Sequence, residues 1–183
     1  MTQDNKNNPA MPAMKASEDA LLNEAKASAV ANDAIIPRRP RRGVWGGRYF
    51  KLHELTYSLT AQQRGIENIP TEEHKRNLEI LVDCVLDRIR EHWGRPIIVS
   101  SGYRCEALNE AVGGVKNSYH RLGMAADIYP VRGGLEALYE CIKTLFMQGK
   151  IGLSECYIDR KKRFIHVAYD NGGFNVWPFV DPL

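Results

Sequence analysis

"SYHRLGMAADI", residues 118–128, places a histidine and an aspartate seven positions apart with small residues between them. His120 and Asp127 both carry side chains that bind metal ions. Gly123, Ala125 and Ala126 would let the backbone pass close to such an ion and leave room beside it. The stretch therefore predicts two ligands of a metal site, with a further ligand from elsewhere in the chain.

A third donor stands in "RFIHVAY", residues 163–169. Strand alternation makes His166 a single polar group on an otherwise apolar face, where it needs a partner. A catalytic zinc site takes three protein ligands and keeps one position open. We therefore expect His120, Asp127 and His166 to bind Zn²⁺. The pattern equally allows a structural interpretation, in which His120 caps a loop, Asp127 ends a strand and His166 is a hydrogen-bonded core histidine.

The segments around this stretch alternate between helical and strand patterns. Apolar residues recur at helical spacing over a helix that Thr71 caps and Gly94 ends, and again over 133–149. A short helix is expected after Cys105. Strands are predicted at residues 97–99, 124–130, 154–159 and 163–169. This order predicts an α+β fold, with a small, mainly antiparallel sheet and flanking helices.

Two parts of the chain differ in composition. Residues 1–48 form a leader, with a helix expected over about 18–33 and the basic linker "PRRPRR" at 37–42. Residues 1–50 hold eight Lys/Arg against five Asp/Glu, whereas residues 51–183 hold seventeen of each. Arginines without interleaved aromatic residues or a DNA-binding motif are weak grounds for phosphate binding, so no nucleic acid partner is expected.

The folded domain is expected to cover residues 49–183 and to begin near Tyr49. Its apolar anchors are predicted to be Phe50, Leu52, Leu55 and Leu59.

The composition is that of a globular protein, with 44% apolar residues. The four cysteines lie 21, 36 and 15 residues apart, which predicts reduced thiols rather than a cysteine zinc site. No apolar run reaches the length of about 18 residues that spans a bilayer, and the N-terminus lacks the apolar stretch of a secretory signal. We expect a monomer made in the cytoplasm and no membrane association.

Three motifs together carry a resemblance to a known family. "SGYRCEALNEAVGG" (101–114), "SYHRLGMAADI" and "FIHV" (164–167) resemble the zinc D-Ala-D-Ala carboxypeptidase and L-Ala-D-Glu endopeptidase family of peptidoglycan hydrolases, which includes phage endolysins. The signature S-x-H-x-x-G-x-A-x-D is matched in full, and the likeness covers nearly all of residues 49–170. It implies a zinc domain like that of Hedgehog and the DD-peptidases.

The resemblance also implies a function. The substrate would be the stem peptide of peptidoglycan, hydrolysed by metal-activated water. The enzyme would reach the cell wall by lysis or by phage-type release.

The resemblance assigns roles to individual residues. His120, Asp127 and His166 would be the zinc ligands, and Arg104 of "SGYR" would hold carbonyl or carboxylate charge of the substrate. A fixed guanidinium stabilises an anionic tetrahedral intermediate more than the neutral peptide. The competing interpretation is a surface arginine paired with Glu106 or Glu110. Ser118 would either hydrogen-bond the substrate or orient its loop.

The chain departs from the family at the general base. Many relatives carry an acid three residues before the last histidine, where this chain has Arg163. In the compact branch of the family the preceding strand commonly reads Q-L-I-x-E, and "ECYID" (155–159) occupies the same place here. Asp159 is then the counterpart of that glutamate and is the expected general base. Glu155 is the alternative, because hairpin pairing could set it beside His166. The remaining alternative is that Asp159 simply belongs to a solvated turn and has no catalytic role.

The chain departs from the family at a second position. Phe164 replaces the usual tryptophan and keeps an aromatic wall. The altered base leaves open a noncatalytic, zinc-stabilised module that binds a cell-wall peptide or a protein partner.

Overall fold

The computed structural model describes residue 45, residues 47–169 and residues 179–180. The helix predicted at about 18–33 and the basic linker lie outside the described residues. The boundary between residues 48 and 49 stays a prediction.

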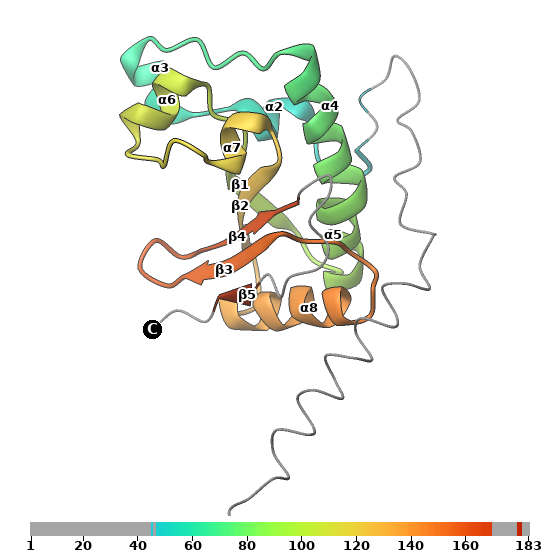
Figure 1. Ribbon diagram of the computed structural model, residues 1–183. Helices are drawn as coiled ribbons and strands as arrows, with labels where there is room; N and C mark the ends of the chain where they lie inside the picture. The colour runs from blue at the N-terminus through green and yellow to red at the C-terminus, as the bar shows by residue number, and fades with distance from the viewer. Residues whose placement is uncertain (1–44, 46, 170–178, 181–183) are drawn as a thin grey trace, which may run out of the picture. The chain divides into compact units, whose positions relative to one another are not determined.

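A five-stranded sheet forms the centre of the fold, in the order β1-β2-β4-β3-β5 (Figure 1). The strands are β1 (Ile97–Ser101), β2 (Ala125–Pro130), β3 (Glu155–Asp159), β4 (Phe164–Ala168) and β5 (Phe179–Val180). All neighbours are antiparallel except β3 and β5, which are parallel. The α+β class with a small, mainly antiparallel sheet is thus confirmed. Strand β5 was not predicted, because two residues are too short to show alternation.

Helices precede and interrupt the strands. They are α2 (Leu52–Thr56), α3 (Leu59–Arg64), α4 (Glu72–Leu81), the π-helical turn η1 (Val82–Leu86), α5 (Asp87–Trp93), α6 (Glu106–Ala111), α7 (Tyr119–Leu122) and α8 (Leu135–Met147). The long predicted helix is confirmed as α4, η1 and α5 in succession. Thr71 caps its start through a hydrogen bond from His74 N to Thr71 Oγ1 of 3.2 Å, and Gly94 ends it in the left-handed conformation. Within the described part of the chain, no helix has the length and apolar character needed to cross a membrane.

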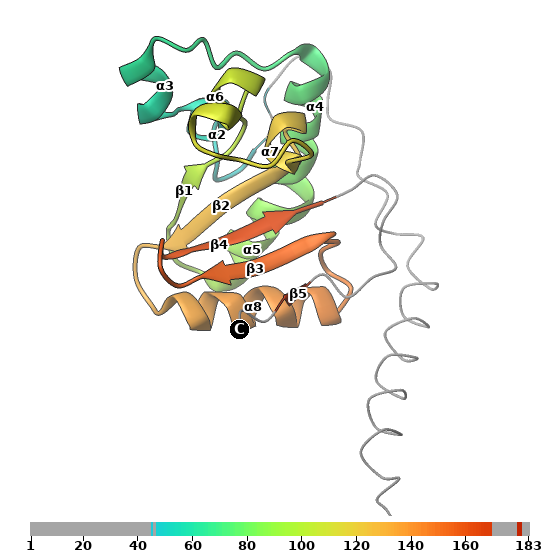
Figure 2. The same ribbon diagram turned by 60° about the vertical axis from the view of Figure 1, so that its left-hand side comes forward.

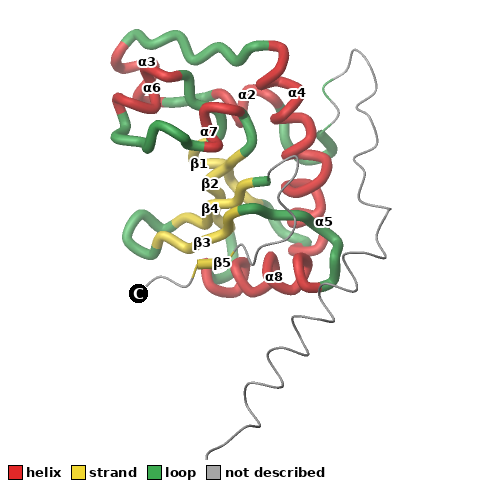
Figure 3. The backbone as a smooth tube through the Cα atoms, viewed as in Figure 1, coloured by secondary structure: helices red, strands yellow, loops and turns green. Residues whose placement is uncertain are grey.

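The two faces of the sheet have different roles. Helices α4, α5 and α8 lie along one side of the strands (Figure 3), and the core forms where their apolar side chains meet those of the sheet. Ile128 of β2 and Ile165 and Val167 of β4 point into this core and are fully buried. Because side chains alternate along a strand, Asp127 and His166 belong to the opposite face. The core therefore fixes the face on which the polar residues gather.

The segment before α4 is attached to this core. Phe50 and Leu55 are buried as predicted. Leu59 is 57% exposed, so its prediction as an anchor is wrong; it is the first residue of the short helix α3, which buries Ala61 instead. The carboxylate of Asp87 on α5 accepts hydrogen bonds from the backbone N–H groups of residues 48 and 49, at 2.6 and 3.1 Å.

Candidate metal centre

His120 comes from the one-turn helix α7, which lies at one end of β2 (Figure 2). Its Nδ1 lies 2.6 Å from the carbonyl oxygen of Gly102. Because a carbonyl only accepts, Nδ1 donates, and the lone pair of the neutral ring is then on Nε2. The backbone of the loop after β1 thus selects Nε2 of His120 as the atom free to bind a cation.

Asp127 and His166 are direct neighbours across two strands. The β2–β4 register places Asp127 opposite His166, and His166 Nδ1 lies 2.8 Å from Asp127 Oδ1. His120 Nε2 lies 3.2 Å from the same oxygen and 3.3 Å from His166 Nδ1. The three residues are 2%, 4% and 4% exposed, and their ligand atoms lie within 4.8 Å of one another. The structure therefore brings the three predicted ligands together in a group that could hold a metal ion.

The donor set and its protonation fit a divalent cation. Two imidazole nitrogens and one carboxylate oxygen are typical of zinc sites that keep an open position. Burial lowers the pKa of His120, which favours the neutral ring that binds metal. Burial would raise the pKa of Asp127, but hydrogen bonds from His120 and His166 outweigh it and keep that pKa well below its usual range. The aspartate is therefore ionised at neutral pH.

His166 has the opposite shift. Burial would lower its pKa, but the hydrogen bond with Asp127 and the negative charges of Asp127 and Glu155 outweigh burial and raise it. Because this pKa is raised, a proton competes more strongly with a metal ion for His166 than it would for an ordinary histidine.

Arg104 supports Asp127 from the loop after β1. Its Nη2 donates to Asp127 Oδ2 at 2.8 Å and its Nε donates to Ser101 Oγ at 2.9 Å. Glu106, proposed above as a partner of Arg104, instead forms an ion pair with Arg121 at 2.9 Å. The structure thus places Arg104 against a candidate metal ligand, and its side chain is only 15% exposed.

Asn68 holds the loop that carries Arg104, and the sequence did not indicate it. Its Nδ2 donates to the carbonyl of Tyr103 at 2.9 Å and to that of Thr56 at 2.8 Å. Its Oδ1 accepts from the N–H of Cys105 at 2.7 Å. Both backbone neighbours of Arg104 are thereby fixed. No local pattern marks this residue, because its partners lie 12 to 37 residues away.

Ser118 stands at the N-cap position of α7. Its side chain makes no capping hydrogen bond, although its backbone oxygen accepts from Arg121 N at 3.0 Å. Its expected role in orienting the loop or contacting substrate stays a prediction.

The two acidic residues of β3 occupy different surroundings. Glu155, Tyr157 and Asp159 pair with alternate residues of β4 and share the face of His166. Tyr157 is directly opposite His166 and stacks on it, with ring centroids 4.7 Å apart. Glu155 Oε2 lies 3.4 Å from His166 Nε2, a contact without hydrogen-bond geometry, and the nearby histidine lowers the pKa of Glu155. Asp159 Oδ1 accepts from Lys162 N at 2.8 Å within the β3–β4 turn.

A comparison with protein families matches this part of the chain. The sequence model described as peptidase M15 matches residues 48–168, which include every residue of the site described above. No curated protein matches the chain.

Proposed function

The chain belongs to the peptidase M15 family of metal-dependent peptidases, and from this premise we propose that it is a zinc enzyme that hydrolyses the stem peptides of peptidoglycan. The bond cut would be of the D-Ala-D-Ala carboxypeptidase or the L-Ala-D-Glu endopeptidase type. The observation that carries the proposal is the buried cluster of His120, Asp127 and His166 on the sheet face opposite the core. Such a cluster has little value for stability alone, since it buries three polar groups.

A bound zinc ion would supply Lewis acidity and lower the pKa of a water molecule. The chain's own part is to hold the three donors in place. The Gly102 carbonyl orients His120, and Arg104 orients Asp127. We assign Glu155 to orienting His166, because it lies beside Nε2 while Nδ1 faces the other donors.

Arg104 is the residue proposed to contact the substrate. Its bonds to Asp127 and Ser101 use two of the five N–H groups of a guanidinium. The remaining N–H groups are assigned to the substrate carbonyl or carboxylate oxygen, where negative charge develops. Ser118, before His120, is assigned to orienting the loop.

Asp159 is proposed as the general base. The contact of Glu155 with the far nitrogen of His166 suits a positioning residue, which leaves Asp159 as the other carboxylate on this face of β3. Asp159→Asn should remove the group that takes a proton from the attacking water and lower kcat by about 10²-fold or more. Glu155→Gln should mainly weaken zinc binding. Equal loss of kcat with unchanged zinc affinity in both variants would contradict this division.

The function is tested on the purified full chain. Elemental analysis should find zinc, and mass spectrometry of muropeptides before and after incubation should find new products. His166→Ala should lose both. Bound zinc without any product would refute the peptidase and favour the noncatalytic binding module, for which Arg163 at the usual acid position is the specific observation.

A further inference from the structure

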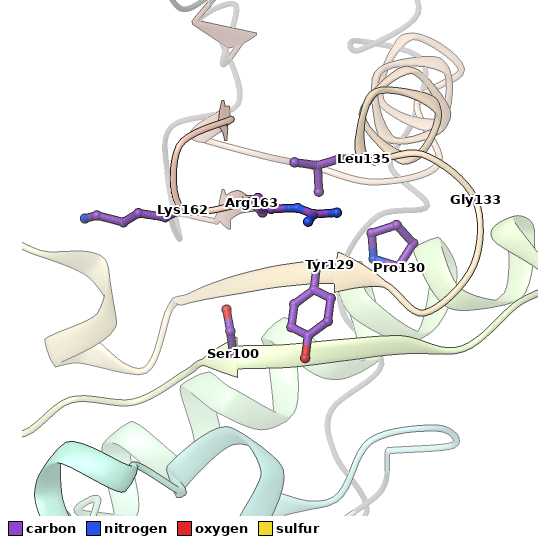
Figure 4. A pocket seen from close by; sticks show the side chains of 7 residues that line it. All are labelled: Ser100, Tyr129, Pro130, Gly133, Leu135, Lys162 and Arg163. Carbon is purple, nitrogen blue, oxygen red and sulfur yellow. The ribbon is translucent and has the colours of Figure 1, made fainter.

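A cavity of about 390 Å³ lies between β2, the start of α8 and the β3–β4 turn (Figure 4). It is lined by Ser100, Tyr129, Pro130, Gly133, Leu135, Lys162 and Arg163. None of the metal-site residues lines it, so it is a separate feature of the surface. These seven residues are called the cationic pocket below.

The cationic pocket is next to the metal centre. Tyr129 stands two residues after Asp127 on β2 and so shares its face, and Ser100 Oγ donates to the backbone oxygen of Asp127 at 3.1 Å. Two strand residues span about 6.6 Å. An extended peptide advances about 3.3–3.6 Å per residue, so the pocket would receive a group about two residues from the bond being cut.

The charge of the pocket is positive and unbalanced. Lys162 and Arg163 line it and no carboxylate does. Over the described ranges 47–169 and 179–180, no hydrogen bond or ion pair engages the side chain of Arg163, whereas neighbouring Arg160 contacts Glu136 at 3.4 Å. Figure 4 shows Arg163 extending between Leu135 and the Tyr129–Pro130 side, while Lys162 extends the other way. Lys162 and Arg163 are both exposed, so an anion in solution can reach them.

The backbone at Arg163 adds a second, independent observation. Its φ of 62° is the one positive value at a non-glycine position in the described part of the chain. A β-carbon in this conformation carries a steric penalty that glycine lacks. The chain therefore holds an arginine at a turn position where glycine would be more stable.

We propose that the cationic pocket binds a free carboxylate of the peptide substrate through Arg163. This inference rests on the proposed peptidase function and adds a determinant of specificity to it. The carboxylate would belong to a residue about two positions from the cleaved bond, and its salt bridge to Arg163 would orient the peptide along β2.

The test uses a synthetic stem peptide and a series in which each free carboxylate is replaced, one at a time, by its amide. For the wild-type chain, amidation of one particular carboxylate should lower kcat/KM by about tenfold or more, as expected for loss of a charge-assisted hydrogen bond. Arg163→Gly should abolish this discrimination and should fold at least as stably as wild type. Lys161→Ala, in the same turn but outside the pocket, is the matched control and should keep the discrimination.

Equal kcat/KM values across the wild-type series, or unchanged discrimination in Arg163→Gly, would overturn the inference. If the wild-type chain cleaves none of the peptides, the proposed function fails, and calorimetric binding of the same peptides decides about the pocket. A carboxylate preference that Arg163→Gly removes supports it, and equal affinity for acid and amide forms refutes it.

Discussion

Gly123 offers a direct test of how the loop between two proposed ligands packs against the long helix. Its φ is 73°, and a β-carbon added there would lie 2.6 Å from the carbonyl oxygen of His74 and 3.1 Å from Leu78 Cγ. The backbone of α4 cannot move away as a flexible side chain could. Gly123→Ala should therefore displace α7, which carries His120.

The magnitude has two parts that a control separates. The left-handed conformation costs an alanine about 1–2 kcal/mol, and the forced contact adds about 1–3 kcal/mol, for roughly 2–5 kcal/mol in total. Gly65 has a φ of 62°, but a β-carbon there would meet nothing within 4 Å. Gly65→Ala should consequently lose only the first part.

The assay is urea unfolding of both variants, followed by a zinc titration against a competing chelator. Gly123→Ala should unfold at a clearly lower urea concentration than Gly65→Ala and bind zinc more weakly, while Gly65→Ala should bind zinc as wild type does. Equal destabilisation of the two variants would refute the close contact between α4 and the segment from His120 to Asp127.

Three further predictions concern the support of the site. Asn68→Ala should lower the free energy of unfolding by about 1.5–4 kcal/mol through the loss of three hydrogen bonds, and should lower kcat because the loop of Arg104 loosens; wild-type kinetics would contradict this. Arg104→Lys keeps the charge but loses the planar guanidinium that donates several hydrogen bonds at once, so kcat/KM should fall by about a hundredfold. Arg121→Lys, at an exposed ion pair, should change kcat/KM little. Because the pKa of His166 is raised in the metal-free protein, a proton competes with the cation, and zinc affinity should rise with pH until that pKa is passed. Titrations between about pH 5 and 8 measure this, and a flat affinity would exclude His166 as a ligand.

Long periodic segments were predictable and short ones were not. The helix from Thr71 to Gly94 and the strands around Asp127 and His166 repeat their patterns over enough residues to be read locally. Helices α2, α3 and α7 have four to six residues, and packing rather than periodicity determines them. The exposed Leu59 shows the same limit, since an isolated leucine does not reveal which face of a short helix is buried.

By itself, the sequence predicted the three donor side chains through its resemblance to a zinc peptidase family, and it predicted the strand face of His166 because alternation is a local property of the backbone. Only the tertiary structure decided what surrounds these donors: the Gly102 carbonyl on His120, Arg104 on Asp127, and Glu155 beside His166. Those contacts join residues far apart in the chain, and the strand register and loop path that create them follow from how the whole core packs.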